Sequence, residues 1–351
     1  MSLVVSLQGT ASQIIYAGMI GDVFSALFKM VGVTSMDRTK CIVLIATTAL
    51  WPMCLLRNLS AMAFTSILGF SAVMYTVFFI VVRALDGSYS VESGGRFVSS
   101  MQDLSLLVAT PSFAKSSLWN VDFTSLVLVS NLGLAYIAHY NAPSYWSELQ
   151  HNKVPGRFAS MVRVSYAILT TIYLLAMCAG YYTFGDVCMG NILLNYHPGD
   201  ILSTLGRLAT GFSIVFGFPL VHNGAREGLK SFTSSAFGWR SLSDPKNHVL
   251  LATAYLTVVS TIAILVKDVR LVVGLAGAAF GSFLVYICPV LVYLRILQNI
   301  QGPDSMEYKR AKNNNLLLIP FGIFCGSMGV AMTLKEAMNR AVAAAAITQS
   351  N

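Results

Sequence analysis

The chain has 351 residues, of which 55% are hydrophobic and only 11% are charged, whereas soluble domains carry charge on roughly a quarter of their residues. So little charge cannot cover a globular surface, which excludes an ordinary soluble domain and indicates an integral membrane protein. The net charge of +8 is typical of basic cytoplasmic loops, and no nucleic-acid partner is expected.

Nine apolar stretches approach the length of about 20 residues that a membrane-spanning helix needs. They are Leu7–Phe28, Cys41–Leu56, Ala61–Val82, Leu126–Tyr145, Val164–Phe184, Ile201–His222, Val249–Val266, Leu271–Leu294 and Leu316–Leu334. The second is short and contains Pro52. Because a spanning segment must satisfy its backbone groups internally, helices are expected, and the fold class is an all-α, multi-pass bundle.

A Gly/Ser-rich loop, residues 86–122, divides the chain and is expected on the extracytoplasmic or lumenal side. Residues 1–85 precede the loop, residues 123–297 carry the next five spans, and residues 298–351 hold the final helix and a tail. If the N-terminus is cytoplasmic, most Lys and Arg residues face the cytoplasm. Lys29, Arg38 and Lys40 are then exceptions on the opposite side.

The stretch AYIAHYNAPSYWSEL, residues 135–149, follows an apolar run but contains its own helix breaker. Pro143 lacks an N–H group and its ring clashes with the carbonyl of His139, so the helix is predicted to loosen there. Unpaired backbone in a membrane is tolerated only in a cavity or within protein, and secondary transporters hold substrate at such broken helices. A simple kinked helix end, anchored by Tyr145 and Trp146, is the alternative.

The candidate substrate-binding residues are the polar side chains in and before this break, Asn131, His139 and Asn141. A histidine in a membrane titrates near neutral pH and can carry a proton. A packed, hydrogen-bonded histidine is the alternative for His139.

Other polar residues in the apolar runs have simpler interpretations. Ser213 is expected to bond to the backbone of its own helix, with a second role as a candidate oxygen ligand for a coupling cation. Asp22 is expected to be a carboxylate at the membrane surface. The small residues of Gly274–Gly281 favour close helix packing, although a sliding gate would need the same surface.

Neither an enzyme motif nor a cysteine pair spaced as CxxC is present in the sequence. No GxSxG, HExxH or phosphate-binding loop is found, so neither catalysis nor a bound cofactor is expected.

Six motifs together resemble the amino acid/auxin permease family, in particular its sodium-coupled neutral amino acid transporter-like and vacuolar branches. They are SQIIYAGMIGD (12–22), WPMCLLRNLSAMAFTSILG (51–69), AYIAHYNAPSYWSEL (135–149), GYYTFGDVCMGNILLNY (180–196), RLATGFSIVFGFPLVHNGAREGL (207–229) and GLAGAAFGSFLVYICP (274–289).

The resemblance implies a LeuT-type fold with two inverted five-helix repeats and a final helix. The first apolar stretch of this sequence aligns with the third span of the family, so an N-terminally truncated chain of nine spans is expected. Ser213 falls near a hydroxyl ligand of sodium-coupled members, but Gly217 stands at a neighbouring hydroxyl position. Proton coupling is therefore expected as much as sodium coupling.

The expected function is secondary active transport of amino acids by alternating access, in the plasma membrane or a vacuolar or lysosomal membrane. The expected partners are an amino acid and the lipid bilayer; the sequence does not predict the oligomeric state. Two alternatives remain open: a non-transporting nutrient sensor or regulatory partner of a full-length relative, and a membrane enzyme.

Overall fold

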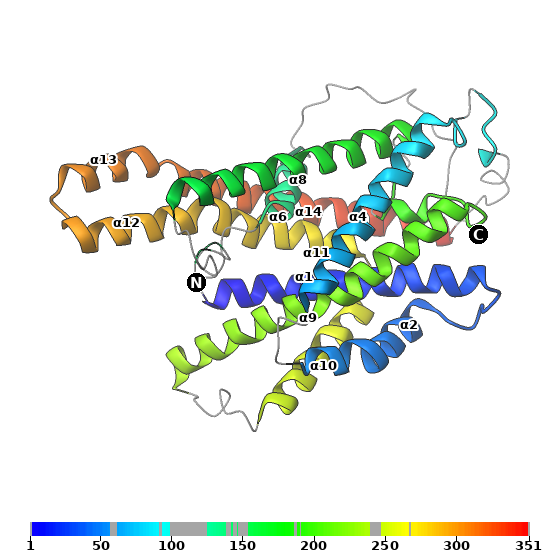
Figure 1. Cartoon of the computed structure of the whole chain (residues 1–351), viewed down its shortest axis with the longest axis horizontal. Helices are drawn as coiled ribbons and strands as arrows, with labels where there is room; N and C mark the ends of the chain where they lie inside the picture. The colour runs from blue at the N-terminus through cyan, green and yellow to red at the C-terminus, as the bar shows by residue number, and fades with distance from the viewer. Residues whose placement is uncertain are drawn as a thin grey trace.

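The computed structural model describes residues 2–56, 62–90, 93–98, 125–137, 142, 146, 154–185, 188–189, 191–238, 247–266 and 268–349. They form a bundle in which α1, α8, α12 and α14 lie along the long axis, while α4, α9 and α10 run obliquely (Figure 1). The long helices are α1 (Ser2–Met30), α4 (Met62–Leu85), α8 (Pro155–Phe184), α9 (Ile201–Phe237), α10 (His248–Leu265) and α14 (Leu318–Gln349). The shorter ones are α2 (Arg38–Ile45), α3 (Trp51–Cys54), α6 (Ser125–Ala135), α11 (Val269–Ala276), α12 (Cys288–Gln301) and α13 (Met306–Asn315).

Seven helical segments among the described residues are long and apolar enough to cross a membrane. They are Leu3–Met30, Ile67–Leu85, Gly156–Phe184, Ile201–Phe237, His248–Leu265, Val269–Gln301 and Met306–Asn339. The structure therefore confirms a multi-pass helical membrane protein, but the described residues provide seven candidate spans and not the nine predicted.

Two of the predicted spans are not among the seven candidate spans, each for its own reason. The predicted span Cys41–Leu56 falls on the continuous helical stretch formed by α2, the π-helical turn η1 (Ala46–Leu50) and α3, residues 38–54, which is shorter than each of the seven candidate spans. Pro52 has no N–H for the carbonyl of Thr48, which lies within that turn, and the widened turn is the expected consequence. Of the predicted span Leu126–Tyr145, only α6 and the two residues after it are described continuously.

Helix α1 lies at the centre of the fold and contacts α2, α9, α10 and α11. Ala17 and Ile20 of α1 pack with Leu50, Phe218 and Val259 into one buried apolar core. A second core lies where α4, α8 and the turn η4 (Ile192–Leu194) meet. Its larger members are Phe79, Tyr89, Phe97, Phe184 and Tyr196.

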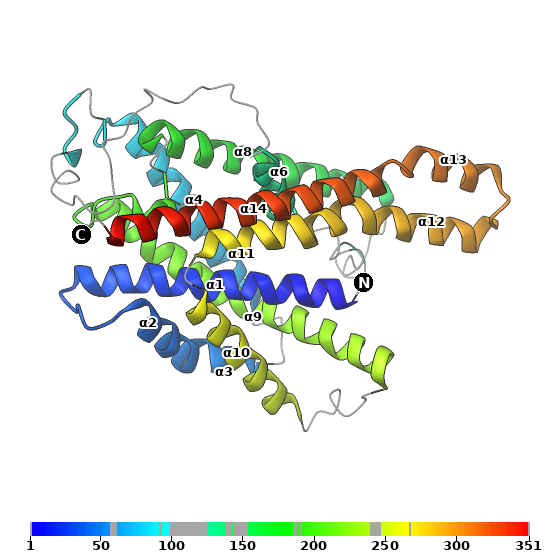
Figure 2. The ribbon, with the colours of Figure 1, turned by 180° about the vertical axis from the view of Figure 1, so that it is seen from behind.

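The helix termini lie at two opposite ends of the bundle. Figures 1 and 2 show the α1–α2 loop and the start of α9 at one end, with α13, the start of α8 and the end of α9 at the other. The turn η4, which precedes α9, and the α12–α13 hairpin therefore lie at opposite ends of the bundle (Figures 1 and 2).

Candidate functional site

Helix α6 ends inside the bundle, at Ala135, and two tyrosines of α8 take up its free carbonyl groups. The Tyr173 hydroxyl donates to the Ala135 carbonyl at 3.0 Å, and the Tyr166 hydroxyl donates to the Tyr136 carbonyl at 3.1 Å. The helix thus stops before His139 is reached. The end of a helix leaves carbonyls without partners, and here side chains from a neighbouring helix supply them.

The same tyrosines hold the chain rigidly as it leaves α6. The ring of Tyr136 stacks on Tyr166 at 6.1 Å between centroids and meets the edge of Tyr173 at 5.2 Å. Its hydroxyl lies 3.0 Å from Oγ1 of Thr170. Sequence reasoning missed these α8 residues, although Tyr166, Thr170 and Tyr173 recur at helical spacing and so share one face.

The predicted break between His139 and Pro143 lies outside the described residues, as do His139 and Asn141 themselves. In the described residues α6 ends at Ala135, four residues before His139.

Asn131 lies one turn before the end of α6 and is the predicted substrate-binding residue that the structure describes. Its Oδ1 atom is buried and has no hydrogen-bond partner among the described residues. A buried amide oxygen without a donor is costly, and a hydrogen-bond donor or a cation would satisfy it. An ammonium group is such a donor.

The face of α6 packs against the π-helical turn η7 (Gly277–Gly281), which also contacts α14 and α1. A π-helical turn also occurs at η1 and at η8 (Phe283–Ile287), and each of those contains the residue four positions before a proline, Pro52 or Pro289. No proline explains η7 in this way. Single π turns are frequent at functional sites, and this one lies against α6, the helix that carries Asn131.

Close packing around this turn confirms the predicted role of the small residues. A Cβ atom on Gly274 would lie 2.6 Å from Thr333, and one on Gly326 would lie 3.1 Å from the Ala278 carbonyl. Helix α14 therefore approaches α11 and η7 more closely than larger side chains would allow.

Ser213 bonds to a different partner from the one predicted. Its hydroxyl donates to the carbonyl of Gly69 on α4 at 3.2 Å, and so joins α9 to α4. The expected bond to its own helix is not the one found, because Gly69 has no side chain and lets the α4 backbone approach the hydroxyl.

Asp22 is paired rather than free at the membrane surface. Arg38 donates to its Oδ1 at 2.8 Å and also to the Ala263 carbonyl at 3.0 Å, so that α1, α2 and α10 are joined. Arg38, one of the expected exceptions to the charge bias, is thus paired with a carboxylate.

A second polar network crosses α1, α9 and α10. The Gln13 Oε1 atom lies 2.9 Å from Nδ1 of His222, and the Gln13 amide nitrogen lies 3.4 Å from the Tyr255 hydroxyl. That hydroxyl lies 2.5 Å from Oγ1 of Thr10. Gln13 and His222 are both 0% exposed. Sequence reasoning missed this network, since its members are single polar residues in three separate apolar runs.

A buried ion pair closes the end of the bundle that carries residues 185–200. Arg83 binds both oxygens of Asp200, at 2.8 Å from Nε and 2.6 Å from Nη2. The Tyr89 hydroxyl also donates to Asp200 at 3.0 Å, and burial raises the pKa of Tyr89, so that its hydroxyl remains a donor. We call Arg83, Asp86, Tyr89 and Asp200 the outer latch.

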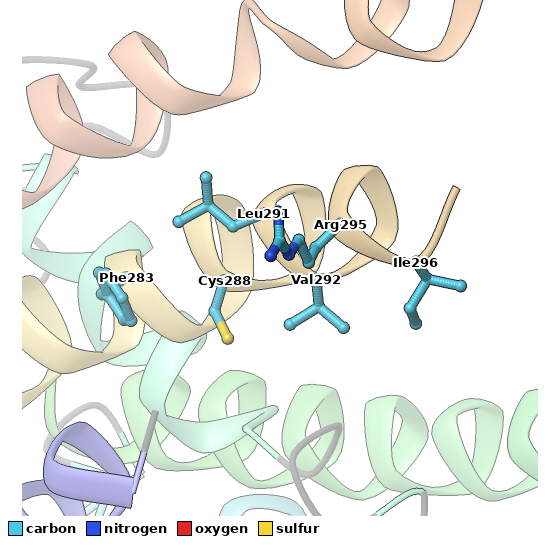
Figure 3. A pocket seen from close by; sticks show the side chains of 6 residues that line it. All are labelled: Phe283, Cys288, Leu291, Val292, Arg295 and Ile296. Atoms are coloured by element: carbon cyan, nitrogen blue, oxygen red, sulfur yellow. The ribbon is translucent and has the colours of Figure 1, made fainter. Parts of the chain in front are cut away.

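Two cavities lie along the helix that runs from α11 through η7 and η8 to α12. One, of about 450 Å³, is lined by residues of η7, η8 and α14. The other, of about 320 Å³, is lined by one helix, with Cys288, Val292 and Ile296 on the same side (Figure 3). The lining of the second is apolar except for Arg295, so it offers no partner to an ammonium group.

Comparison with known proteins decides the family. The model of the transmembrane amino acid transporter protein family matches residues 1–335. The chain belongs to this family. The matched region includes α6, η7 and the four residues of the outer latch. A transporter family also agrees with the expectation that the chain is not an enzyme.

The chain is also similar to a protein described as vacuolar amino acid transporter 5 of Schizosaccharomyces pombe (strain 972 / ATCC 24843). The two are 22% identical over 292 residues, which make up 83% of this chain. The matched region spans 64% of the length of that relative.

Proposed function

We propose that this chain acts in secondary active transport of amino acids across a vacuolar or plasma membrane. The observation that carries the proposal is the family match over residues 1–335, which the similarity to a vacuolar amino acid transporter supports. The proposed mechanism is alternating access on a LeuT-type arrangement of nine spans, in which one group of helices rocks against the rest.

The substrate site in this proposal lies beside the end of α6. The unpaired Oδ1 of Asn131 accepts a hydrogen bond from the ammonium group of the amino acid. The π turn η7 lies against α6 and is the element that shifts when the substrate is enclosed. A widened turn has a weaker hydrogen-bond ladder than an α-helix, so less energy opposes its movement.

Coupling to a proton or to sodium is the second part of the proposal. The Ser213 hydroxyl donates its hydrogen bond to the Gly69 carbonyl, so the lone pairs of its Oγ atom remain available to a cation. In a sodium-coupled protein, Ser213→Ala would weaken the sodium dependence of uptake. In a proton-coupled protein, the same variant would lose only the bond between α9 and α4.

The test is uptake of radiolabelled amino acids by the purified chain in liposomes, with a proton gradient or a sodium gradient imposed separately. We expect saturable uptake that one gradient drives, and a KM at least about tenfold higher in Asn131→Ala, since a bond to a charged group is lost. Asn315→Ala is the matched control, because that residue lies on α13 and bonds only to its own helix, at the Ala311 carbonyl.

Absence of uptake under both gradients, from protein that remains folded, would overturn the transport proposal. It would favour the alternative of a nutrient-sensing or regulatory partner. Equal loss in Asn131→Ala and Asn315→Ala would instead remove Asn131 from the site.

A further inference from the structure

A buried arginine beside the first turns of α1 lacks the acceptors that its charge requires. Arg226 of α9 is 4% exposed and donates one hydrogen bond, from Nη2 to Oδ1 of Asn223 at 2.9 Å. Its Nε and Nη1 atoms are buried and have no hydrogen-bond partner among the described residues. A guanidinium has five N–H groups and stays charged in proteins. The N–H groups on Nε and Nη1 therefore have no acceptor among the described residues.

The nearest carboxylate does not satisfy this charge. Oε1 of Glu227 lies 3.6 Å from Nε of Arg226, which is beyond hydrogen-bond distance. The side chain of Glu227 is 60% exposed, and the same oxygen accepts from Lys230 at 2.9 Å. Glu227 is therefore shared between Lys230 and Arg226, and it accepts no hydrogen bond from the arginine.

A second unpartnered group lies one helical turn before the arginine, on the same face of α9. Nδ1 of His222 lies 2.9 Å from Oε1 of Gln13. That oxygen can only accept, so Nδ1 carries the proton and Nε2 is a bare acceptor. Nε2 is buried and has no partner among the described residues.

The surroundings of the two side chains are positive. Arg226 and His248 lie close enough to His222 for their charges to act on it. The ring of Tyr255 lies 5.3 Å from that of His222, and Arg226 also acts on Cys54 of α3. None of these neighbours is a carboxylate, so the described residues build a buried positive site without its anion.

We propose that Arg226 and His222 form a carboxylate-binding site on α9, which the carboxylate of the amino acid occupies during transport. This inference rests on the proposed function and adds a second substrate position, distinct from Asn131 on α6. A bound carboxylate accepts from Nε and Nη1 of Arg226, which pairs the buried charge. His222 then takes a proton from solvent at Nε2 and donates it as a hydrogen bond to the same anion.

The proton and the carboxylate depend on each other. Without an anion, a proton on His222 places a second positive charge one helical turn from Arg226; with the anion bound, that repulsion is offset. Binding of the carboxylate therefore takes up a proton, and by linkage it strengthens as pH falls.

The test uses the purified full chain in detergent, with acetate, L-alanine, ethylamine and chloride as separate titrants in calorimetry. We expect acetate and alanine to bind, ethylamine not to bind, and chloride to compete weakly. Arg226→Gln should lower the affinity for acetate by about tenfold or more, since a charged hydrogen-bonded pair is lost. Arg270→Gln, on the exposed end of α11, is the control and should leave binding unchanged.

The histidine has its own readout. His222→Gln should retain binding of acetate but lose the increase in affinity at lower pH. Binding that is as strong for ethylamine as for alanine, or chloride that binds as well as acetate, would overturn the assignment of a carboxylate site.

Thermal unfolding separates this site from a structural role. Removal of a buried, incompletely paired charge should raise the apparent melting temperature of ligand-free Arg226→Gln by about 2 °C or more. Acetate should raise the melting temperature of the wild type and not that of the variant. A destabilised variant that still binds acetate normally would show that Arg226 is structural.

The two proposals also fail separately. Acetate binding without any amino acid uptake would retain the site and reject transport. Uptake with an unchanged KM in Arg226→Gln would retain transport and reject the site.

Discussion

At the scale of single residues, the outer latch shows how a buried ion pair is satisfied. Asp200 is 0% exposed and accepts from Arg83, from Tyr89 and from the backbone N–H of Leu202 at the start of α9. Every lone pair that it presents is used, in contrast to Arg226, whose Nε and Nη1 atoms have no acceptor among the described residues. Breaking a satisfied pair of this kind leaves a buried charge without its partner, which is costly.

We predict that Asp200→Asn destabilises the protein by about 3–5 kcal/mol, because it leaves the Arg83 charge without its main partner. Thermal or denaturant unfolding of the purified protein measures the change. Asp304→Asn is the control, since Asp304 is 97% exposed and its pair with Lys309 is a surface contact. Equal melting temperatures for the two variants would contradict the account of the latch.

The latch also has a defined pH dependence at Asp86. Burial raises the pKa of Asp86, but the Ser88 N–H and the Arg83 guanidinium outweigh burial, and the pKa lies below its ordinary value. A lowered pKa in the folded state contributes stability above the unfolded value of about 3.9 and loses it as pH falls through the folded value.

The difference in melting temperature between wild type and Asp86→Asn should therefore stay constant above about pH 5 and shrink only below about pH 4. A pH series of melting curves for both proteins tests this. A difference that disappears near pH 6 would mean that another group controls the latch.

At the scale of helices, glycine positions set how closely α4 and α9 pack. A Cβ on Gly206 of α9 would lie 2.2 Å from the ring of Phe79, which is itself 0% exposed. Gly217, further along the same helix, has nothing within 4 Å of its Cβ position. Gly206 is thus required for close packing of α9 on α4, whereas Gly217 has room for a larger side chain.

We predict that Gly206→Ala destabilises the fold by about 1–3 kcal/mol through overpacking. Gly217→Ala should be neutral or stabilise it by up to about 1 kcal/mol, because alanine favours a helix. Unfolding curves of the two variants provide the comparison. A stable Gly206→Ala variant would mean that α4 and α9 separate easily at this point.

At the scale of the whole molecule, chemical labelling of cysteines tests which end of the bundle faces the cytoplasm and which faces the extracytoplasmic or lumenal side. Cys188 is exposed and lies outside the candidate spans, whereas Cys41, Cys54, Cys288 and Cys325 are buried and Cys178 lies within a span. With a cytoplasmic N-terminus, a membrane-impermeant maleimide should label Cys188 only from the extracytoplasmic or lumenal side. Labelling from the cytoplasmic side of sealed vesicles would reverse the topology.

The chemistry of Cys188 adds a second readout to that experiment. Burial raises the pKa of its thiol, so the reactive thiolate is scarcer at neutral pH than in a free cysteine. The labelling rate should rise steeply with pH above about 8.5, and Cys188→Ser should abolish it. A rate that does not change with pH would mean that the labelled group is not this thiol.

The sequence by itself determined the membrane class, the family and most of the spans. Apolar runs of spanning length have few alternative structures in lipid, since only helices satisfy their own backbone. It also predicted close packing at Gly274–Gly281, because glycine has no side chain to hold two helices apart.

Only the tertiary structure decided which polar residues meet. The carbonyls at the end of α6 are bound by tyrosines of α8, and Ser213 binds α4 rather than its own helix. Arg226 and His222 stand out because their neighbours on α1, α3 and α10 offer no anion. Such pairings depend on how separate helices pack, and a hydropathy pattern read along one chain contains no information about contacts between helices.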